Sequence, residues 1–181
     1  MKKVDLHVHS TYSDGTNTPK ELIKLAENEG LSAIALTDHD TLDGIPDALD
    51  AAKNSSVELI PGVELSTNFN NTEVHIVGLF LDHNNKQIND YLIYQRQSRI
   101  DRNIQMCQKF CDIGINITYD KMCELYPDAV ITRAHFADYL VKNKYTGDRN
   151  EAFDRYLSPG KPCFVNRHKV DPEEAIAVIH K

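Results

Sequence analysis

Two histidines stand one residue apart near the start of the chain, in the stretch Asp5-Leu6-His7-Val8-His9. Residues two apart in a strand point to the same face, so Asp5, His7 and His9 share one side of a strand predicted over residues 3–9. A single histidine in such a place is more often a hydrogen-bonded core residue. Three polar residues on one face favour a centre filled by water or metal instead.

Other residues that can bind metal follow the next predicted strands, and one lies in a Ser-Asp-Gly turn after the first strand. They are Asp14, His39 in Thr37-Asp38-His39-Asp40, Glu64 in Gly62-Val63-Glu64, and His75 in EVHIVG. The carboxyl ends of parallel strands are where barrels and open α/β sheets place their active sites. Imidazole with carboxylate and without thiolate suits zinc, manganese or iron.

The six candidates exceed the needs of one ordinary divalent ion, so we expect at least two ions. Two neighbouring ions can generate a hydroxide at neutral pH and clamp the oxygens of a displacement at phosphorus. Hydrolysis of a phosphate ester is therefore the leading chemistry. Asp14 alone could equally be a turn former, and Asp38 and Asp40 are expected to support ligands or form turns. We expect His83, His168 and His180 to lie outside the site.

The first third of the chain alternates strands and helices, which implies parallel strands with helices packed outside, as an open sheet or a barrel. The apolar face of the first strand, with Val4 and Leu6, is expected to pack under helices. Two extended segments then follow, joined by a hairpin or a loop. The predicted strands cover residues 3–9, 32–37 and 57–63, the helices 18–30 and 45–53, and the extended segments 64–67 and 73–81.

Residues 86–156 have mostly helical spacing, with a long amphipathic segment followed by three shorter helices. Cys163–Asn166 is predicted as a strand that returns to the main domain, and Pro172–Lys181 as a helix. We therefore predict a metal-binding catalytic domain over residues 1–85 and 162–181, and an inserted helical substrate-binding subdomain over residues 86–161. The four cysteines form no C-x-x-C pair, and we expect buried reduced thiols.

The composition excludes several classes of protein. A formal net charge of −7 over 181 residues argues against a surface built to follow long duplex nucleic acid. No apolar run approaches the roughly 20 residues that cross a bilayer, and the N-terminus has no signal-peptide core. We expect a soluble, cytoplasmic protein that does not act on membranes.

The motifs DLHVHSTYSDG, LTDHD, PGVELS and EVHIVGLF occur in that order, and the chain resembles the polymerase and histidinol phosphatase (PHP) family. It is most similar to the small nucleotide phosphoesterase branch, in which a helical subdomain is inserted into the catalytic domain. The resemblance implies a distorted seven-stranded β/α barrel, here incomplete, that holds two or three manganese, zinc or iron ions. The ligands it implies are His7, His9, Asp14, His39, Glu64 and His75.

Members of this family continue beyond a helix like PEEAIAVIHK to a histidine-proline pair and a later D-x-H motif. Neither follows that helix here, so further ligands are expected beyond Lys181 if the chain belongs to a longer protein. If those ligands are absent altogether, a metal-binding or nucleotide-binding module without turnover is the alternative.

Arginines three residues apart in the long helix, Arg96, Arg99 and Arg102, suit phosphate oxygens, or they form a solvated face with Asp101. The resemblance implies that Arg99, Arg102, Arg133 and His135 line the substrate pocket. His135 could protonate a leaving oxygen, or it could cap a helix. Tyr119, Tyr126 and Tyr139 could stack on a base, but core packing is the commoner role.

The function predicted is hydrolysis of a small nucleotide, such as a nucleoside bisphosphate, or of a short oligonucleotide end, by metal-activated hydroxide. A histidinol-phosphate-type phosphatase is the second enzymatic possibility, although the inserted arginine-bearing helices weigh against so small a substrate.

Overall fold

The protein is described from a computed structural model that defines residues 2–70, 72–167 and 170–181. His168, considered above, lies outside the described residues. The chain divides into two compact units, Met1–Arg96 with Lys169–Lys181, and Gln97–His168. The division falls between Arg96 and Gln97, inside the long helix Lys86–Asp112, and not at residue 86 where the sequence pattern changes. That the second unit is an inserted substrate-binding subdomain stays a prediction.

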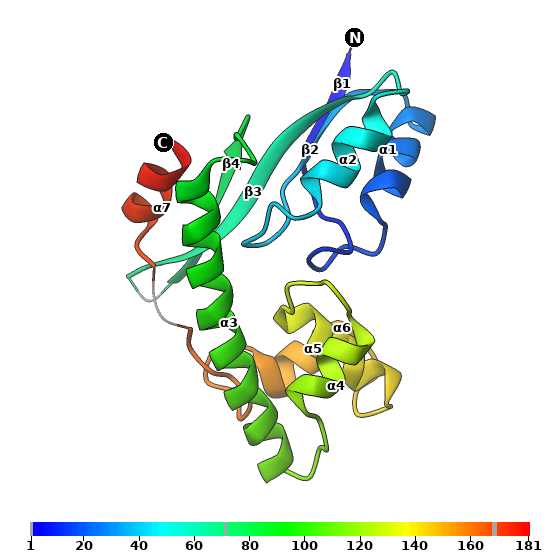
Figure 1. Ribbon diagram of the computed structural model, residues 1–181. Coiled ribbons are helices and arrows are strands. Elements are labelled where there is room, and N and C mark those ends of the chain that lie inside the picture. The colour runs from blue at the N-terminus through cyan, green and yellow to red at the C-terminus, as the bar shows by residue number, and fades with distance from the viewer. Residues whose placement is uncertain (1, 71, 168–169) are drawn as a thin grey trace. The chain divides into compact units, whose positions relative to one another are not determined.

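The first unit is built on one curled sheet of four strands in the order β1-β2-β3-β4 (Figure 1). The strands are β1 (Lys3–Val8), β2 (Leu31–Leu36), β3 (Glu58–Phe69) and β4 (Thr72–Leu79). β1, β2 and β3 run parallel, and β4 pairs antiparallel with β3. The α/β class is confirmed, whereas the seven-stranded barrel stays a prediction. The strand predicted over residues 57–63 and the extended segment predicted over residues 64–67 form one continuous strand, β3.

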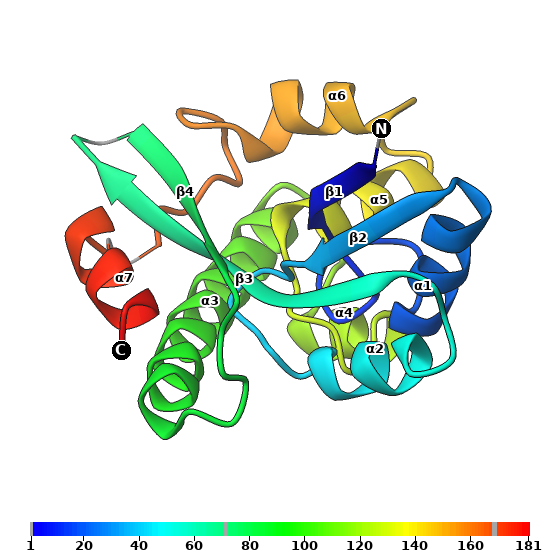
Figure 2. The ribbon, with the colours of Figure 1, turned by 90° about the horizontal axis from the view of Figure 1, so that it is seen from above.

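Three helices pack against this sheet. They are α1 (Pro19–Asn28), α2 (Ile45–Ala52) and α7 (Pro172–Ile179). α1 begins with the expected capping box: the Thr18 side chain accepts from the Glu21 N–H, and the Glu21 carboxylate accepts from the Thr18 N–H. α1 and α2 lie beside β2 and β3, and α7 lies beside β3 and β4 (Figure 2).

Apolar side chains between these helices and the sheet form the core of the first unit. Its fully buried members include Leu36, Ile45, Val63, Leu65 and Leu92. The first turns of α3 (Lys86–Asp112) contribute to this core through Ile88 and Leu92. Burial of side chains of this size stabilises the fold by roughly 1.5–3 kcal/mol each before the entropy of ordering is subtracted.

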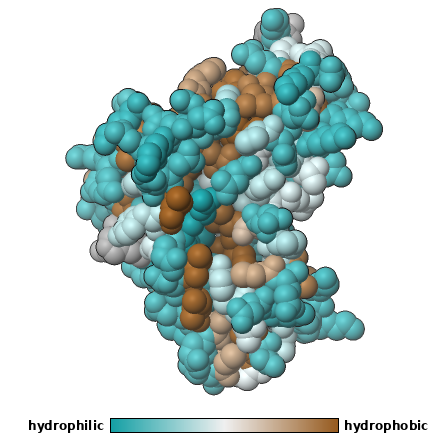
Figure 3. Space-filling model, in the orientation of Figure 1, coloured by the Kyte–Doolittle hydropathy of each residue, from teal (hydrophilic) through white to brown (hydrophobic). Residues whose placement is uncertain are grey.

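The apolar face of β1 differs from expectation. Val4 and Leu6 are 52% and 41% exposed, so that face does not pack under helices. β1 hydrogen-bonds to β2 at the edge of the sheet, and among the described residues β2 is its strand neighbour. The space-filling view shows apolar atoms at the surface of this unit, among hydrophilic ones (Figure 3).

The second unit is helical. It contains the C-terminal part of α3 (Lys86–Asp112), then α4 (Tyr119–Leu125), α5 (Arg133–Lys142), α6 (Arg149–Ala152) and a π-helix (Phe153–Leu157). Its own core is built on Met106, Phe110, Met122, Phe136 and Leu140. Cys163–Asn166 forms no strand, which corrects the returning strand predicted there.

The cysteines follow the prediction only in part. Cys107 and Cys163 are buried, whereas Cys111 and Cys123 are exposed. Cys111 lies in the last turn of α3, next to the fully buried Phe110. In the part of the chain that the structure describes, no helix is long and apolar enough to cross a membrane.

Candidate metal centre

All six residues predicted as ligands gather in the first unit. Their nitrogen and oxygen atoms form three groups, and within each group the atoms lie within 4.8 Å of one another. The groups share members, so they make one continuous cluster. They are His7 with His9 and Glu64, His9 with Asp14 and His39, and His39 with Glu64 and His75.

The strand order explains how these segments meet. His7 lies in β1 and His9 directly follows it, while His39 follows β2. An isolated parallel bridge joins His39 to Glu64 of β3, and the Asp40 N–H donates to the Glu64 carbonyl at 3.1 Å. The antiparallel register places His75 of β4 opposite Ser66, two residues from Glu64. The parallel strand ends therefore converge, as the alternation of strands and helices predicts.

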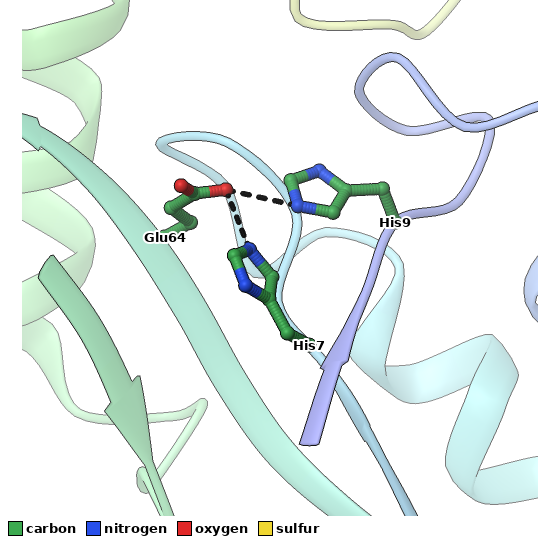
Figure 4. Close-up of side chains that lie close together, drawn as sticks. All are labelled: His7, His9 and Glu64. Carbon is green, nitrogen blue, oxygen red and sulfur yellow. Dashed lines mark hydrogen bonds and ion pairs between the residues drawn. The ribbon is translucent and has the colours of Figure 1, made fainter. Parts of the chain in front are cut away.

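Glu64 is the centre of the cluster, with a side chain only 6% exposed. Its Oε2 lies 3.0 Å from His7 Nε2, 2.9 Å from His9 Nε2 and 3.5 Å from His39 Nδ1. Figure 4 shows His7 and His9 pointing from β1 and its end toward this oxygen. The other oxygen, Oε1, lies 2.6 Å from His75 Nδ1.

Asp14 closes the opposite side of the cluster. Its Oδ1 lies 3.2 Å from His9 Nδ1, and its Oδ2 lies 3.5 Å from His39 Nε2. His9 and His39 therefore each lie between two carboxylates, Asp14 and Glu64. Their rings approach edge to face, with centroids 4.7 Å apart.

This packing of opposite charges shifts the pKa values. Burial alone would raise the pKa of Glu64, but hydrogen bonds from His75 and His9 and the charge of His39 hold it well below its usual range. Burial opposes protonation of His9, but Asp14 and Glu64 outweigh it and raise the pKa of His9 to about 9. Hydrogen bonds to Glu64 and Glu73 raise the pKa of His75 to about 9.

The donor set fits divalent metal ions. Four imidazoles and two carboxylates surround one small volume, and four of the residues turn a nitrogen toward the Glu64 carboxylate. The raised pKa values of His9 and His75 mean that, without metal, protons on these two rings compensate the carboxylate charges. A divalent cation can replace these protons, because metal binding to imidazole releases them. Nitrogen and oxygen donors without sulfur suit zinc, manganese or iron.

Sequence reasoning missed two residues that contact the cluster. Glu73 Oε1 lies 3.4 Å from His75 Nε2, on the side of the ring away from Glu64. Ser13 Oγ lies 3.3 Å from His9 Nδ1. The signal for Glu73 is its position two residues before His75, which puts both on one strand face. Asp38 and Asp40, expected to support ligands or form turns, are buried and lie outside the three groups.

The residues predicted to bind substrate belong to the second unit. Arg99 and Arg102 are each 6% exposed, so the alternative of a solvated face is wrong for both. Arg96 lies in the first unit, where it donates to Asp43 Oδ2 at 2.6 Å and to Thr41 Oγ1 at 3.0 Å. The Arg133 guanidinium lies over the Phe164 ring, 5.8 Å from its centroid.

His135 caps a helix, as one of its two predicted roles required. Its Nδ1 accepts a hydrogen bond of 2.9 Å from the Thr132 N–H at the start of α5, and the residue is buried. Its ring packs against Tyr126, with centroids 4.3 Å apart. Tyr119, Tyr126 and Tyr139 pack against the core of the second unit, which is the commoner of the two roles considered for them.

Known proteins resemble this chain over nearly all its length. It is 42% identical to a 5'-3' exoribonuclease of Haemophilus influenzae over 179 residues, which cover 99% of this chain and 65% of the relative. It is 36% identical to a 3',5'-nucleoside bisphosphate phosphatase of Chromobacterium violaceum, covering 99% of this chain and 63% of the relative.

A solved structure from Bifidobacterium adolescentis, inferred to be a metal-dependent phosphoesterase, superimposes with a TM-score of 0.92 at 27% identity. That match covers 99% of this chain and 63% of the other. The chain thus spans less than two thirds of the length of these relatives. Residues 5–176 match the PHP domain family. The chain belongs to the PHP domain family.

Proposed function

We propose that the protein is a metal-dependent phosphoesterase that acts on a small nucleotide, such as a nucleoside bisphosphate, or on the end of a short oligonucleotide. The observation that carries this proposal is the cluster of four histidines and two carboxylates around the buried Glu64 side chain. The exoribonuclease and bisphosphate phosphatase among its relatives both act on phosphate esters of nucleotides.

His7, His9, Asp14, His39, Glu64 and His75 would hold two or three ions of manganese, zinc or iron. Such ions supply Lewis-acid activation of water and compensate the negative charge of a phosphate. The protein's own part would be to hold the ligands in place. The Glu64 carboxylate contacts four histidines, and the Asp14 carboxylate contacts His9 and His39.

We propose that Arg99, Arg102 and Arg133 bind phosphate oxygens of the substrate. The burial of Arg99 and Arg102 supports this, because guanidinium groups held away from bulk solvent bind phosphate more strongly than exposed ones. His135 would contribute through Nε2. Its Nδ1 accepts from the Thr132 N–H, so the neutral ring carries its proton on Nε2, the form that can donate a hydrogen bond to a phosphate or leaving oxygen.

The test combines metal analysis with a substrate panel. We expect purified protein to contain divalent metal by elemental analysis, and to release products from nucleoside 3',5'-bisphosphates, dinucleotides or short oligoribonucleotides faster than from histidinol phosphate. Preference for histidinol phosphate would favour the second enzymatic possibility. Metal binding without turnover of any of these would support a non-catalytic module.

A pair of variants in one strand isolates the site. Glu64→Gln removes the central carboxylate, and we expect it to lose metal and activity together. Glu58→Gln makes the same change in β3 at an exposed position, and we expect it to retain both. Full metal content in Glu64→Gln would contradict the proposed centre.

A further inference from the structure

The carboxylate of Asp38 is buried and accepts three hydrogen bonds. None of the three donors belongs to a predicted metal ligand. The donors are the Ser10 N–H at 2.7 Å, the Ser10 hydroxyl at 2.6 Å and the Ser13 hydroxyl at 2.5 Å. The residue is 2% exposed. All three donors lie within hydrogen-bond distance, so the carboxylate oxygens accept both hydroxyl protons.

Both serines lie in the loop that joins two predicted ligands, His9 and Asp14. The loop is closed by its own backbone, with the Ser13 and Gly15 N–H groups donating to the Ser10 carbonyl at 3.1 and 3.0 Å. A Cβ on Gly15 would lie 2.1 Å from the His9 carbonyl oxygen, so the turn admits only glycine there. Asp38 thus ties the end of β2 to the turn that carries Asp14.

The hydrogen bonds around Asp38 fix which atoms accept the hydroxyl protons of Ser10 and Ser13. The Tyr12 N–H donates to Ser10 Oγ at 3.1 Å, so the Ser10 hydroxyl proton is directed to Asp38. The Ser13 hydroxyl likewise gives its single proton to Asp38, which leaves the Ser13 oxygen as an acceptor. The group that faces this oxygen is His9 Nδ1, at 3.3 Å.

His9 Nδ1 therefore has acceptors on its side of the ring: Ser13 Oγ at 3.3 Å and Asp14 Oδ1 at 3.2 Å. An N–H at this atom satisfies both, whereas a lone pair would face two oxygens. The opposite nitrogen, Nε2, lies 2.9 Å from Glu64 Oε2, inside the group formed with His7. Hydrogen bonds to one ring nitrogen decide which nitrogen remains to bind metal.

We propose that Asp38 is a positioning residue that, through Ser13, keeps the proton of His9 on Nδ1 and presents Nε2 as the metal-binding atom. This inference rests on the proposed function, because it assigns the ligand atom of a metal centre. The inference goes beyond the proposed function because it gives a role to the Asp38 carboxylate and the Ser13 hydroxyl, which are not among the predicted metal ligands.

The first measurement is on the wild-type protein loaded with zinc. Long-range hydrogen–nitrogen correlation spectra distinguish the two tautomers of a histidine ring, and the His9 signals are assigned by their loss in His9→Gln. We expect a protonated Nδ1 and a metal-bound Nε2. A protonated Nε2 on His9 would overturn the inference while leaving the metal centre intact.

The second measurement is metal affinity by calorimetric titration. We expect Ser13→Ala and Asp38→Asn each to weaken binding at least about tenfold, which is the range found for residues that orient ligands. Asp47→Asn is the matched control. Asp47 holds the same loop through the Tyr12 hydroxyl at 2.8 Å but has no described link to His9, and we expect its affinity to be that of the wild type.

Ser13→Ala keeps the inference testable if Asp38→Asn fails to fold, because it removes one hydroxyl only; circular dichroism checks both variants. Wild-type affinity and an unchanged His9 tautomer in Ser13→Ala would refute the inference alone. Absence of metal binding in the wild-type protein would overturn the proposed function, and this inference with it.

Discussion

His75 Nδ1 lies 2.6 Å from Glu64 Oε1, and its Nε2 lies 3.4 Å from Glu73 Oε1, so the ring stands between two carboxylates. Both contacts stabilise the imidazolium form, and together they raise the pKa of His75 to about 9. The metal-free protein therefore holds protons at this site at neutral pH. A metal ion bound to His75 would have to displace its proton, so we expect metal binding to depend on pH.

We expect metal affinity to increase as the pH rises toward 9. His9 and His75, whose pKa values are both raised to about 9, must lose their protons to bind metal. Each proton released makes the dissociation constant fall by about tenfold per pH unit below that pKa. Calorimetric titration at several pH values, in buffers of different ionisation enthalpy, measures both the affinity and the protons released. An affinity independent of pH between 6.5 and 9 would contradict this.

The metal-free protein should show the opposite trend in stability. A raised histidine pKa stabilises the fold fully below the unfolded value of 6.5, and this contribution is lost as the pH rises through 9. The lowered pKa of Glu64 contributes stability above its unfolded value of 4.5, and that is lost in acid. Urea unfolding of metal-free protein should therefore give the highest free energy of unfolding between about pH 4.5 and 6.5.

Gly15→Ala should disrupt the Asp14 turn. The added Cβ would meet the His9 carbonyl oxygen at 2.1 Å, and the backbone must move to admit it. We expect a loss of about 1–3 kcal/mol in the free energy of unfolding, as for other overpacked sites, together with weaker metal binding. Gly147→Ala is the control, because its Cβ would meet only the flexible end of Glu151 at 3.3 Å. Equal metal affinity in both variants would show that the turn tolerates a side chain.

Thr18→Ala separates stability from the site. It removes the capping box at the start of α1, and we expect a loss of about 1 kcal/mol in the free energy of unfolding. Thr16→Ala, two residues earlier and exposed, should change it little. Metal content should be the same in both proteins. A loss of metal in Thr18→Ala would mean that the helix start and the metal centre are energetically coupled.

Arg99→Met tests the proposed phosphate-binding role. We expect KM for a nucleotide substrate to rise at least about tenfold with metal content unchanged, because a charge-assisted contact to phosphate contributes roughly 1.5–3 kcal/mol. Arg155→Met removes an exposed arginine of the same unit, whose guanidinium pairs with Glu151, and should leave KM unchanged. A KM in Arg99→Met equal to that of Arg155→Met would argue for a purely structural Arg99.

The candidate ligands were predictable because their positions follow from strand periodicity. His7 and His9 share a face by their spacing, and His39 and Glu64 follow parallel strands whose ends meet. The helix start at Thr18 was predictable for a similar reason, since capping chemistry is local. Strand periodicity and helix capping each depend on a few neighbouring residues, so both can be recognised in the sequence without the tertiary structure.

Other features depend on contacts between distant segments. Ser13 and Asp38 are 25 residues apart, and nothing local indicates that the serine proton goes to that carboxylate. The continuous β3 was divided in the prediction between Val63 and Glu64, where the alternation of strands and helices changes. Pairing with β2 up to Pro61 and with β4 from Gly62 onward carries the strand through that point. The burial of Arg99 is likewise not indicated by the spacing of arginines along the helix.

Among the described residues, β1 pairs on one side only, with β2, and so forms an edge of the sheet. An edge strand with half-exposed apolar residues such as Val4 and Leu6 is a template on which a further strand can add. The same strand carries His7 on its other face, so any strand that paired there would lie directly beside the metal-binding cluster. A strand added along this edge would therefore lie on the same short segment that carries His7 and leads to His9.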